Sequence, residues 1–154
     1  MLSVMSYVER LWPGALGWVG VLAFAAMVGV ALVPVDELLA LVVGLVLALG
    51  GLALVALATP RVEVSRGELR AGAAHIPTRL LGAARALDAD ALRTELGPAL
   101  DARAYVCLRG WIHTAVRVEV RDPQDPTPYW IVSTRRSQAL LAALDTAPAE
   151  HPAS

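Results

Sequence analysis

Two long runs of apolar residues without a charged side chain constrain this chain more than any other feature. The first run covers residues 11–35 and the second covers residues 38–60. A bilayer core about 30 Å thick requires about 20 apolar residues in helical form, and both runs reach that length. Because lipid offers the backbone no hydrogen-bond partner, each run is predicted to be a continuous helix. We therefore expect two membrane spans, at about 13–33 and 38–59.

A very short connection joins the two runs. Residues 34–37 leave room only for a tight reversal, so the two helices are predicted to run antiparallel and to pack as one hairpin. Small residues spaced four apart favour this close approach, although the same pattern also favours a homodimer. These small residues are Ala25, Gly29, Gly44 and Ala48, together with Gly50 and Gly51.

The residues that flank the runs indicate their orientation. Arg10 precedes the first run, Arg61 follows the second, and the loop between the runs carries only acids. Since cytoplasmic loops are enriched in Lys and Arg, we expect a multi-pass protein of the plasma membrane with both termini cytoplasmic. Trp12 and Trp18 lie near one end of the first run, where aromatic rings favour the headgroup layer. Arg10, Trp12, Trp18 and Arg61 are therefore candidate membrane-interface anchors.

A cleaved secretory signal is the competing interpretation of the first run. Residues 23–25, Ala-Phe-Ala, resemble a small-residue cleavage site. However, the run stays apolar for longer than the roughly 7 to 15 residues of a usual signal core. A retained first helix is therefore favoured.

After the second run, apolar residues recur with a period of two, which is typical of half-buried strands. We accordingly divide the chain into a hairpin segment at 1–60, a β-rich domain at 61–145 and a polar tail at 146–154 that we expect to be disordered. One short helix is predicted after Asp88 and a last helix is predicted to be capped by Ser137. Strands are predicted at 61–65, 68–71, 74–76, 80–87, 105–109, 115–121 and 129–134.

This order of elements predicts the fold class. About seven short strands followed by one helix is the order found in a pleckstrin-homology-like barrel, in which two small sheets pack together and the helix closes one open end. We therefore expect a transmembrane α-helical hairpin followed by a small β-rich (α+β) domain of this kind.

Several segments also carry a family resemblance. They are residues 7–13, residues 67–72 with 75–77, residues 114–120, and residues 125–130 with 132–135. In these segments, which together extend over nearly the whole chain, it resembles an actinobacterial family of two-span membrane proteins of uncharacterised function. More distantly, it is similar to bacterial membrane proteins with a C-terminal pleckstrin-homology-like domain. The resemblance assigns no catalytic or ligand residue.

Two arginines at the start of the last predicted helix form a candidate anion site. A helix N-terminus presents free N–H groups, and a guanidinium group matches the geometry of phosphate. Arg135, Arg136 and Ser137 are therefore candidates for contact with an anion or a lipid headgroup. A solvated helix cap is the alternative interpretation, because ordinary helix starts have the same chemistry.

The loop between two of the later strands is a second candidate. Trp111 and Ile112 lie in this loop at residues 109–114. If exposed, they would indicate a contact with a partner or with the lipid interface. Burial of Trp111 in the domain's own core is the alternative.

The sequence shows no constellation that would indicate an enzyme. The histidines His75, His113 and His151 lie far apart, and no zinc-ligand spacing is present. Neither a glycine-rich phosphate loop nor a nucleophile elbow occurs, so we expect no catalytic site, no metal and no cofactor. A net charge of −1 without a basic stripe argues against nucleic acid as a partner. Cys107 falls in a strand pattern and is expected to be a core thiol.

These observations predict a non-enzymatic, membrane-anchored binding module. Its β domain would contact a protein or a lipid headgroup at the cytoplasmic leaflet, where the hairpin raises its local concentration. The alternative is a small structural subunit of a larger membrane complex, with the hairpin as the main contact.

Overall fold

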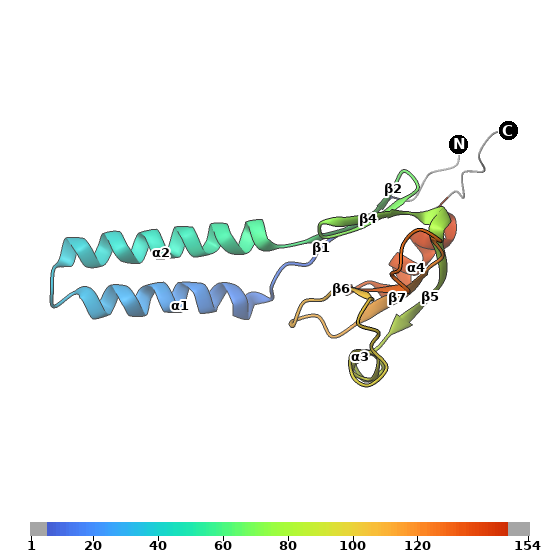
Figure 1. The fold of residues 1–154 in the computed structure, drawn as a ribbon. Coiled ribbons are helices and arrows are strands. Elements are labelled where there is room, and N and C mark those ends of the chain that lie inside the picture. The colour runs from blue at the N-terminus through green and yellow to red at the C-terminus, as the bar shows by residue number, and fades with distance from the viewer. Residues whose placement is uncertain (1–5, 148–154) are drawn as a thin grey trace. The chain divides into compact units, whose positions relative to one another are not determined.

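The computed structural model describes residues 6–147 of the 154 residues (Figure 1). The chain divides into two compact units. One is a helical hairpin at Trp12–Thr59, and the other is a β domain built from the described residues up to Leu11 and from Pro60 onward. From residue 148 on, the tail that we expected to be disordered lies outside the described residues.

The hairpin consists of α1 (Ala15–Leu32) and α2 (Glu37–Ala58), which lie within two residues of the predicted spans. Asp36 begins α2, because its carboxylate accepts a hydrogen bond of 2.8 Å from the backbone N–H of Leu39. Both helices are long and apolar enough to cross a membrane.

Small residues bring α1 and α2 together. A Cβ atom added at Gly29 would lie 3.4 Å from the carbonyl oxygen of Ala40, and one added at Gly44 would lie 3.6 Å from Cα of Gly29. Ala25 and Ala40 are the buried residues of the two helices. The predicted role of Ala25, Gly29 and Gly44 in close packing is thus confirmed.

The large apolar side chains of the hairpin point away from its interior. Leu16 is 89% exposed and Leu57 is 86% exposed, and most of their large neighbours are also exposed. A helix from the core of a water-soluble domain would bury such side chains. So large an apolar surface requires a membrane or a partner to cover it.

The first sheet of the β domain contains a strand that precedes the hairpin. Its order is β1 (Tyr7–Arg10), β2 (Arg61–Ser65), β3 (Glu68–Ala71) and β4 (Ala74–Pro77), all antiparallel. The sequence did not predict β1, since four residues with an inward Glu resemble a leader to the first span. Residues 7–10 therefore belong to the β domain and not to the hairpin segment in which we had placed them.

The second sheet has the order β5 (Leu81–Leu87), β7 (Ala115–Val120), β8 (Tyr129–Ser133) and β6 (Tyr105–Cys107). Its strands are antiparallel except that β6 runs parallel to β8. The remaining elements are η1 (Thr78–Leu80), α3 (Ala89–Leu96) and α4 (Ser137–Thr146). Asp88 caps α3 as predicted, with its carboxylate 2.8 Å from the N–H of Ala91.

The second sheet packs against other elements on both of its faces. One face packs with the first sheet and α4 around the main core, which includes Val116, Val118 and Leu140. The other face packs against α3 in a smaller core of Leu87, Leu92, Ala115, Tyr129 and Ile131. All five residues of β8 are consequently buried.

The domain does not form the closed barrel that we expected. The eight strands within residues 6–147 make two separate four-stranded sheets, with α4 in contact with strands of both. The β-rich character, the two-sheet arrangement and the C-terminal helix are confirmed. The barrel does not close because no strand of the first sheet pairs with a strand of the second.

Candidate functional site

The chain leaves the β domain for the hairpin at two adjacent points. The N–H of Leu11 donates to the carbonyl of Pro60 at 3.1 Å, just beyond the cross-strand pair of Arg10 and Arg61. We call the end of the domain at Leu11 and Pro60 the junction end. Two residue steps join Pro60 to the end of α2, so a fully extended chain could span only about 7 Å. The junction end is therefore held close to the ends of the apolar helices whatever the orientation of the two units.

An exposed tryptophan lies at the junction end. Trp111 donates from its indole Nε1 to the carbonyl of Leu11 at 3.3 Å, and its side chain remains 43% exposed. Its neighbour Ile112 is buried in the main core. Of the two alternatives for Trp111, burial in the core therefore does not apply, and the loop presents an indole ring beside Leu11 at the junction end.

Two arginines face each other at the same end. Arg10 on β1 is the cross-strand partner of Arg61 on β2, and both are exposed on the outer face of the first sheet. Like charges in directly opposed positions disfavour strand pairing. The other candidate anchors are Trp12, just before α1, and Trp18, in its first turn. Their ring centroids lie 5.7 Å apart, with the ring planes tilted by 33°.

A buried carboxylate ties β1 to the start of α4. Glu9 is 8% exposed, and its Oε2 accepts hydrogen bonds of 2.5 Å from both the Tyr7 hydroxyl and the Thr134 hydroxyl. Its Oε1 accepts from the backbone N–H of Arg135 at 3.0 Å. Burial and the hydrogen bond to Glu9 raise the pKa of the Tyr7 phenol above its ordinary value. The phenol therefore stays a neutral donor to the carboxylate.

This network changes the interpretation of the Arg135–Arg136–Ser137 segment. Glu9 of the same chain already accepts from the Arg135 N–H, which an external anion would have used. Arg136, not Ser137, is the N-cap residue of α4, and no side chain caps the helix there. The Arg136 guanidinium lies 5.7 Å from the centre of the Tyr7 ring. The backbone N–H groups of Arg135 and Arg136 thus bond within the chain, and contact of this segment with lipid stays a prediction.

The sequence around Glu9 has the alternation of a strand. In residues 7–10 the alternation Tyr-Val-Glu-Arg places Tyr7 and Glu9 on one face of a strand. Only the tertiary fold brings this face to Thr134, which lies 125 positions from Glu9.

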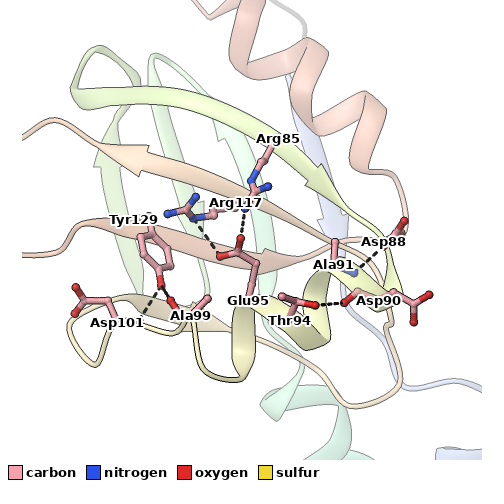
Figure 2. Close-up of polar contacts among 10 residues, drawn as sticks. All are labelled: Arg85, Asp88, Asp90, Ala91, Thr94, Glu95, Ala99, Asp101, Arg117 and Tyr129. Atoms are coloured by element: carbon pink, nitrogen blue, oxygen red, sulfur yellow. Dashed lines mark hydrogen bonds and ion pairs between the residues drawn. The ribbon is translucent and has the colours of Figure 1, made fainter.

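A second polar cluster fastens α3 to the second sheet (Figure 2). Glu95 forms ion pairs with Arg85 and with Nε of Arg117, the latter at 3.5 Å. The Arg117 guanidinium carbon lies 4.1 Å from the centre of the Tyr129 ring. The Tyr129 hydroxyl accepts from the N–H of Asp101 at 2.9 Å. Arg117 thus faces α3, and the cluster fixes the position of this helix on the second sheet.

An open hollow of about 210 Å³ lies between α3 and the loop that carries Trp111. Leu92, Leu96, Leu108 and Ile112 contribute apolar side chains to its walls. Its other lining residues are Ala89, Arg93, Arg109, Gly110 and His113, so the hollow combines an apolar floor with arginine and histidine side chains.

Within residues 6–147, no group of three or more His, Cys, Asp or Glu side chains is placed to hold a metal. Cys107 is buried, and this burial raises the pKa of its thiol. A raised pKa makes the thiolate scarce at neutral pH.

Comparison with known proteins gives one match. A family model described as "Protein of unknown function (DUF3093)" matches residues 6–144. The chain belongs to this family. The match includes β1, both helices of the hairpin and nearly all of α4, so the family comprises the hairpin and the β domain together. Neither a curated protein nor a solved structure matched the chain.

Proposed function

We propose that this protein is a non-enzymatic binding module of the plasma membrane, with both termini in the cytoplasm. Its β domain is held against the cytoplasmic leaflet and contacts lipid headgroups there. The proposal needs neither a cofactor nor nucleic acid. A pleckstrin-homology-like relationship of the β domain fits this function by analogy of fold alone.

The observation that carries the proposal is the hydrogen bond between Trp111 and Leu11. It places a half-exposed indole at the junction end, within a few residues of two helices that are apolar on their outer surfaces. The headgroup layer is about 5–8 Å thick on each side of the hydrocarbon core. Since the tether at Pro60 is about as short, the Trp111 loop can reach the depth where tryptophan is favoured.

Charge at the junction end supports the same proposal. The opposed pair Arg10 and Arg61 sits at the strand ends that continue into the two helices. A basic residue near an anionic membrane surface contributes about 1 kcal/mol of attraction. Two basic residues at the junction end would thus favour an anionic leaflet.

A depth measurement tests this function. Nitroxide labels are attached to Trp111→Cys and, as a matched control, to Gln124→Cys in the exposed loop at the other end of β7. The native Cys107 is buried and has a raised pKa, so it should label slowly. In anionic nanodiscs, position 111 should be protected from an aqueous nickel relaxant while position 124 is not. Equal access at both positions would overturn the proposal.

A second candidate is a structural subunit whose hairpin contacts another membrane protein or a second copy of the chain. Gly20 and Gly50 favour it, because nothing lies within 4 Å of a Cβ added at either position. Both line one groove of the hairpin. Open glycines of this kind permit close approach of another helix.

The same geometry selects the variants for this second candidate. Gly29 is unsuitable, because it packs against α2 within the hairpin. Gly20→Leu and Gly50→Leu should instead release a partner in a mild-detergent pulldown without disturbing the hairpin. If co-purifying proteins persist with both variants, the subunit function is wrong.

A further inference from the structure

We infer that the hollow between α3 and the Trp111 loop is a binding site for a single anionic phospholipid. This inference rests on the proposed function, since it requires the junction end to lie in the headgroup layer. It goes beyond that function by assigning a defined site and a ligand class.

The hollow adjoins the loop that contacts the junction end. Gly110 and Ile112 line the hollow and flank Trp111, whose indole donates to the carbonyl of Leu11. The wall of the hollow is therefore the loop that contacts the junction end. A lipid in the adjacent leaflet can reach the hollow without leaving the interface.

The residues that line the hollow combine apolar side chains with hydrogen-bond donors. Leu92, Leu96 and Ile112 supply an apolar floor, while Arg109 and His113 supply hydrogen-bond donors. One N–H of the Arg109 guanidinium donates to the carbonyl of Leu108 at 2.9 Å. Because a guanidinium group has five N–H donors, others remain for phosphate oxygens. An apolar floor beside such donors suits an amphiphile with an anionic headgroup.

The acids around the hollow have other partners. Arg93 forms an ion pair of 3.2 Å with Asp90, so its charge is shared. Asp88 accepts the hydrogen bond that caps α3. The charge that a ligand meets therefore comes mainly from Arg109, with His113 as a second donor.

The volume of the hollow limits how much of a ligand it can hold. At about 210 Å³, the hollow is smaller than the roughly 300–1,000 Å³ of pockets that enclose a whole small molecule. It can take the phosphate and glycerol of a lipid while the acyl chains stay in the bilayer. A ligand held in this way gains its local concentration from the membrane.

Photo-crosslinking of the full-length protein tests the site. Nanodiscs of phosphatidylcholine contain a small fraction of either phosphatidylglycerol or phosphatidylcholine with a diazirine near the glycerol. Label is then mapped by mass spectrometry to residues 104–117, which contain one wall of the hollow, with label on the hairpin as the internal standard. We expect about fivefold more label at 104–117 from phosphatidylglycerol, because both lipids carry the phosphate but only phosphatidylglycerol has a net negative charge to attract Arg109.

Three variants complete the test. Arg109→Gln should remove most of the preference while keeping the backbone N–H that donates to Ser133. Ala89→Leu should lower the label by filling the hollow, and Arg79→Gln, an equal charge change at an exposed residue that does not line it, should leave the label unchanged.

Equal labelling by both lipids, or labelling that survives Arg109→Gln and Ala89→Leu, would overturn the inference. If the probe at position 111 lies in the interface but residues 104–117 are not labelled, only the lipid site is wrong. If that probe lies in water, the proposed function fails and the site fails with it.

Discussion

The helical hairpin and the β domain are held together by contacts between residues that differ in their separation along the sequence. In the hairpin, Gly29 and Gly44 meet across a turn that joins consecutive helices. In the β domain, Tyr7 bonds to Thr134, which lies 127 positions further along the chain. The hairpin therefore needs only its own residues to form. The domain also requires β1, which the hairpin separates from the rest of the domain in the sequence.

The two units also use different physical interactions. The hairpin packs through small residues and exposes its large apolar side chains. The domain buries apolar side chains and satisfies a carboxylate at the start of α4. This difference indicates that changes in β1 should affect the domain alone, while changes at the helix contact should affect the hairpin alone.

The largest expected effect comes from separating the units. Joining residues 6–11 to 60–147 through Asn-Gly should give a folded, water-soluble domain, because Leu11 and Pro60 are already hydrogen-bonded across adjacent strands. A fragment of 60–147 alone should lack a cooperative thermal transition by circular dichroism, since β2 loses one of its two partner strands and α4 loses Glu9. Equal transitions for both proteins would show that β1 is dispensable.

Removing the buried carboxylate should have the next largest effect. Glu9→Ala leaves the donors of Tyr7, Thr134 and Arg135 without their acceptor, at a cost of about 2–4 kcal/mol in the free energy of unfolding. Urea unfolding of the Asn-Gly protein measures this loss. Glu63→Ala, on the outer face of β2, is the matched control and should cost less than about 1 kcal/mol. The importance of Glu9 would be refuted by equal losses in the two variants.

The helix contact should be sensitive at one glycine and tolerant at another. Gly44→Leu would drive a side chain into α1 and should destabilise the hairpin by about 1–3 kcal/mol. Gly50→Leu enters open space and should change its stability little. Thermal unfolding of the full-length protein in detergent compares the two. A hairpin that tolerates both would not be packed through Gly44.

High pH should weaken the domain through Tyr7. The pKa of the folded phenol is raised above its ordinary value of about 10, so the stabilisation is complete below pH 10 and is lost as pH rises toward the folded pKa. Between pH 10 and 11 the wild type should lose about 1 kcal/mol more than Tyr7→Phe. Urea unfolding at the two pH values measures this, and parallel losses would exclude the phenol as the cause.

Weakening the contact between α3 and the second sheet should have the smallest effect on stability. Glu95→Gln removes the ion pairs with Arg85 and Arg117, both of which are partly exposed to solvent. Such pairs contribute about 1 kcal/mol or less. Hydrogen exchange in α3 should rise while that in β2 and β3 stays the same. Uniform acceleration across the domain would mean that α3 unfolds only together with the sheets.

Much of the local structure was predictable from the sequence. The lengths of the apolar runs, the cap at Asp88 and the alternation of Val62 with Val64 each depend on neighbouring residues. The candidate site was predictable only in part. Trp111 was identified as a loop residue, but its exposure depends on Leu11, which is 100 positions away.

What the sequence by itself determined is the hairpin and the positions of most strands and helices. Hydrophobic length and period specify these through interactions between residues close in the chain. Only the tertiary structure decided that β1 joins the first sheet, that β6 runs parallel to β8 and that Glu9 bonds at the start of α4. Such pairings depend on which distant surfaces meet when the core forms, and no local pattern encodes that choice.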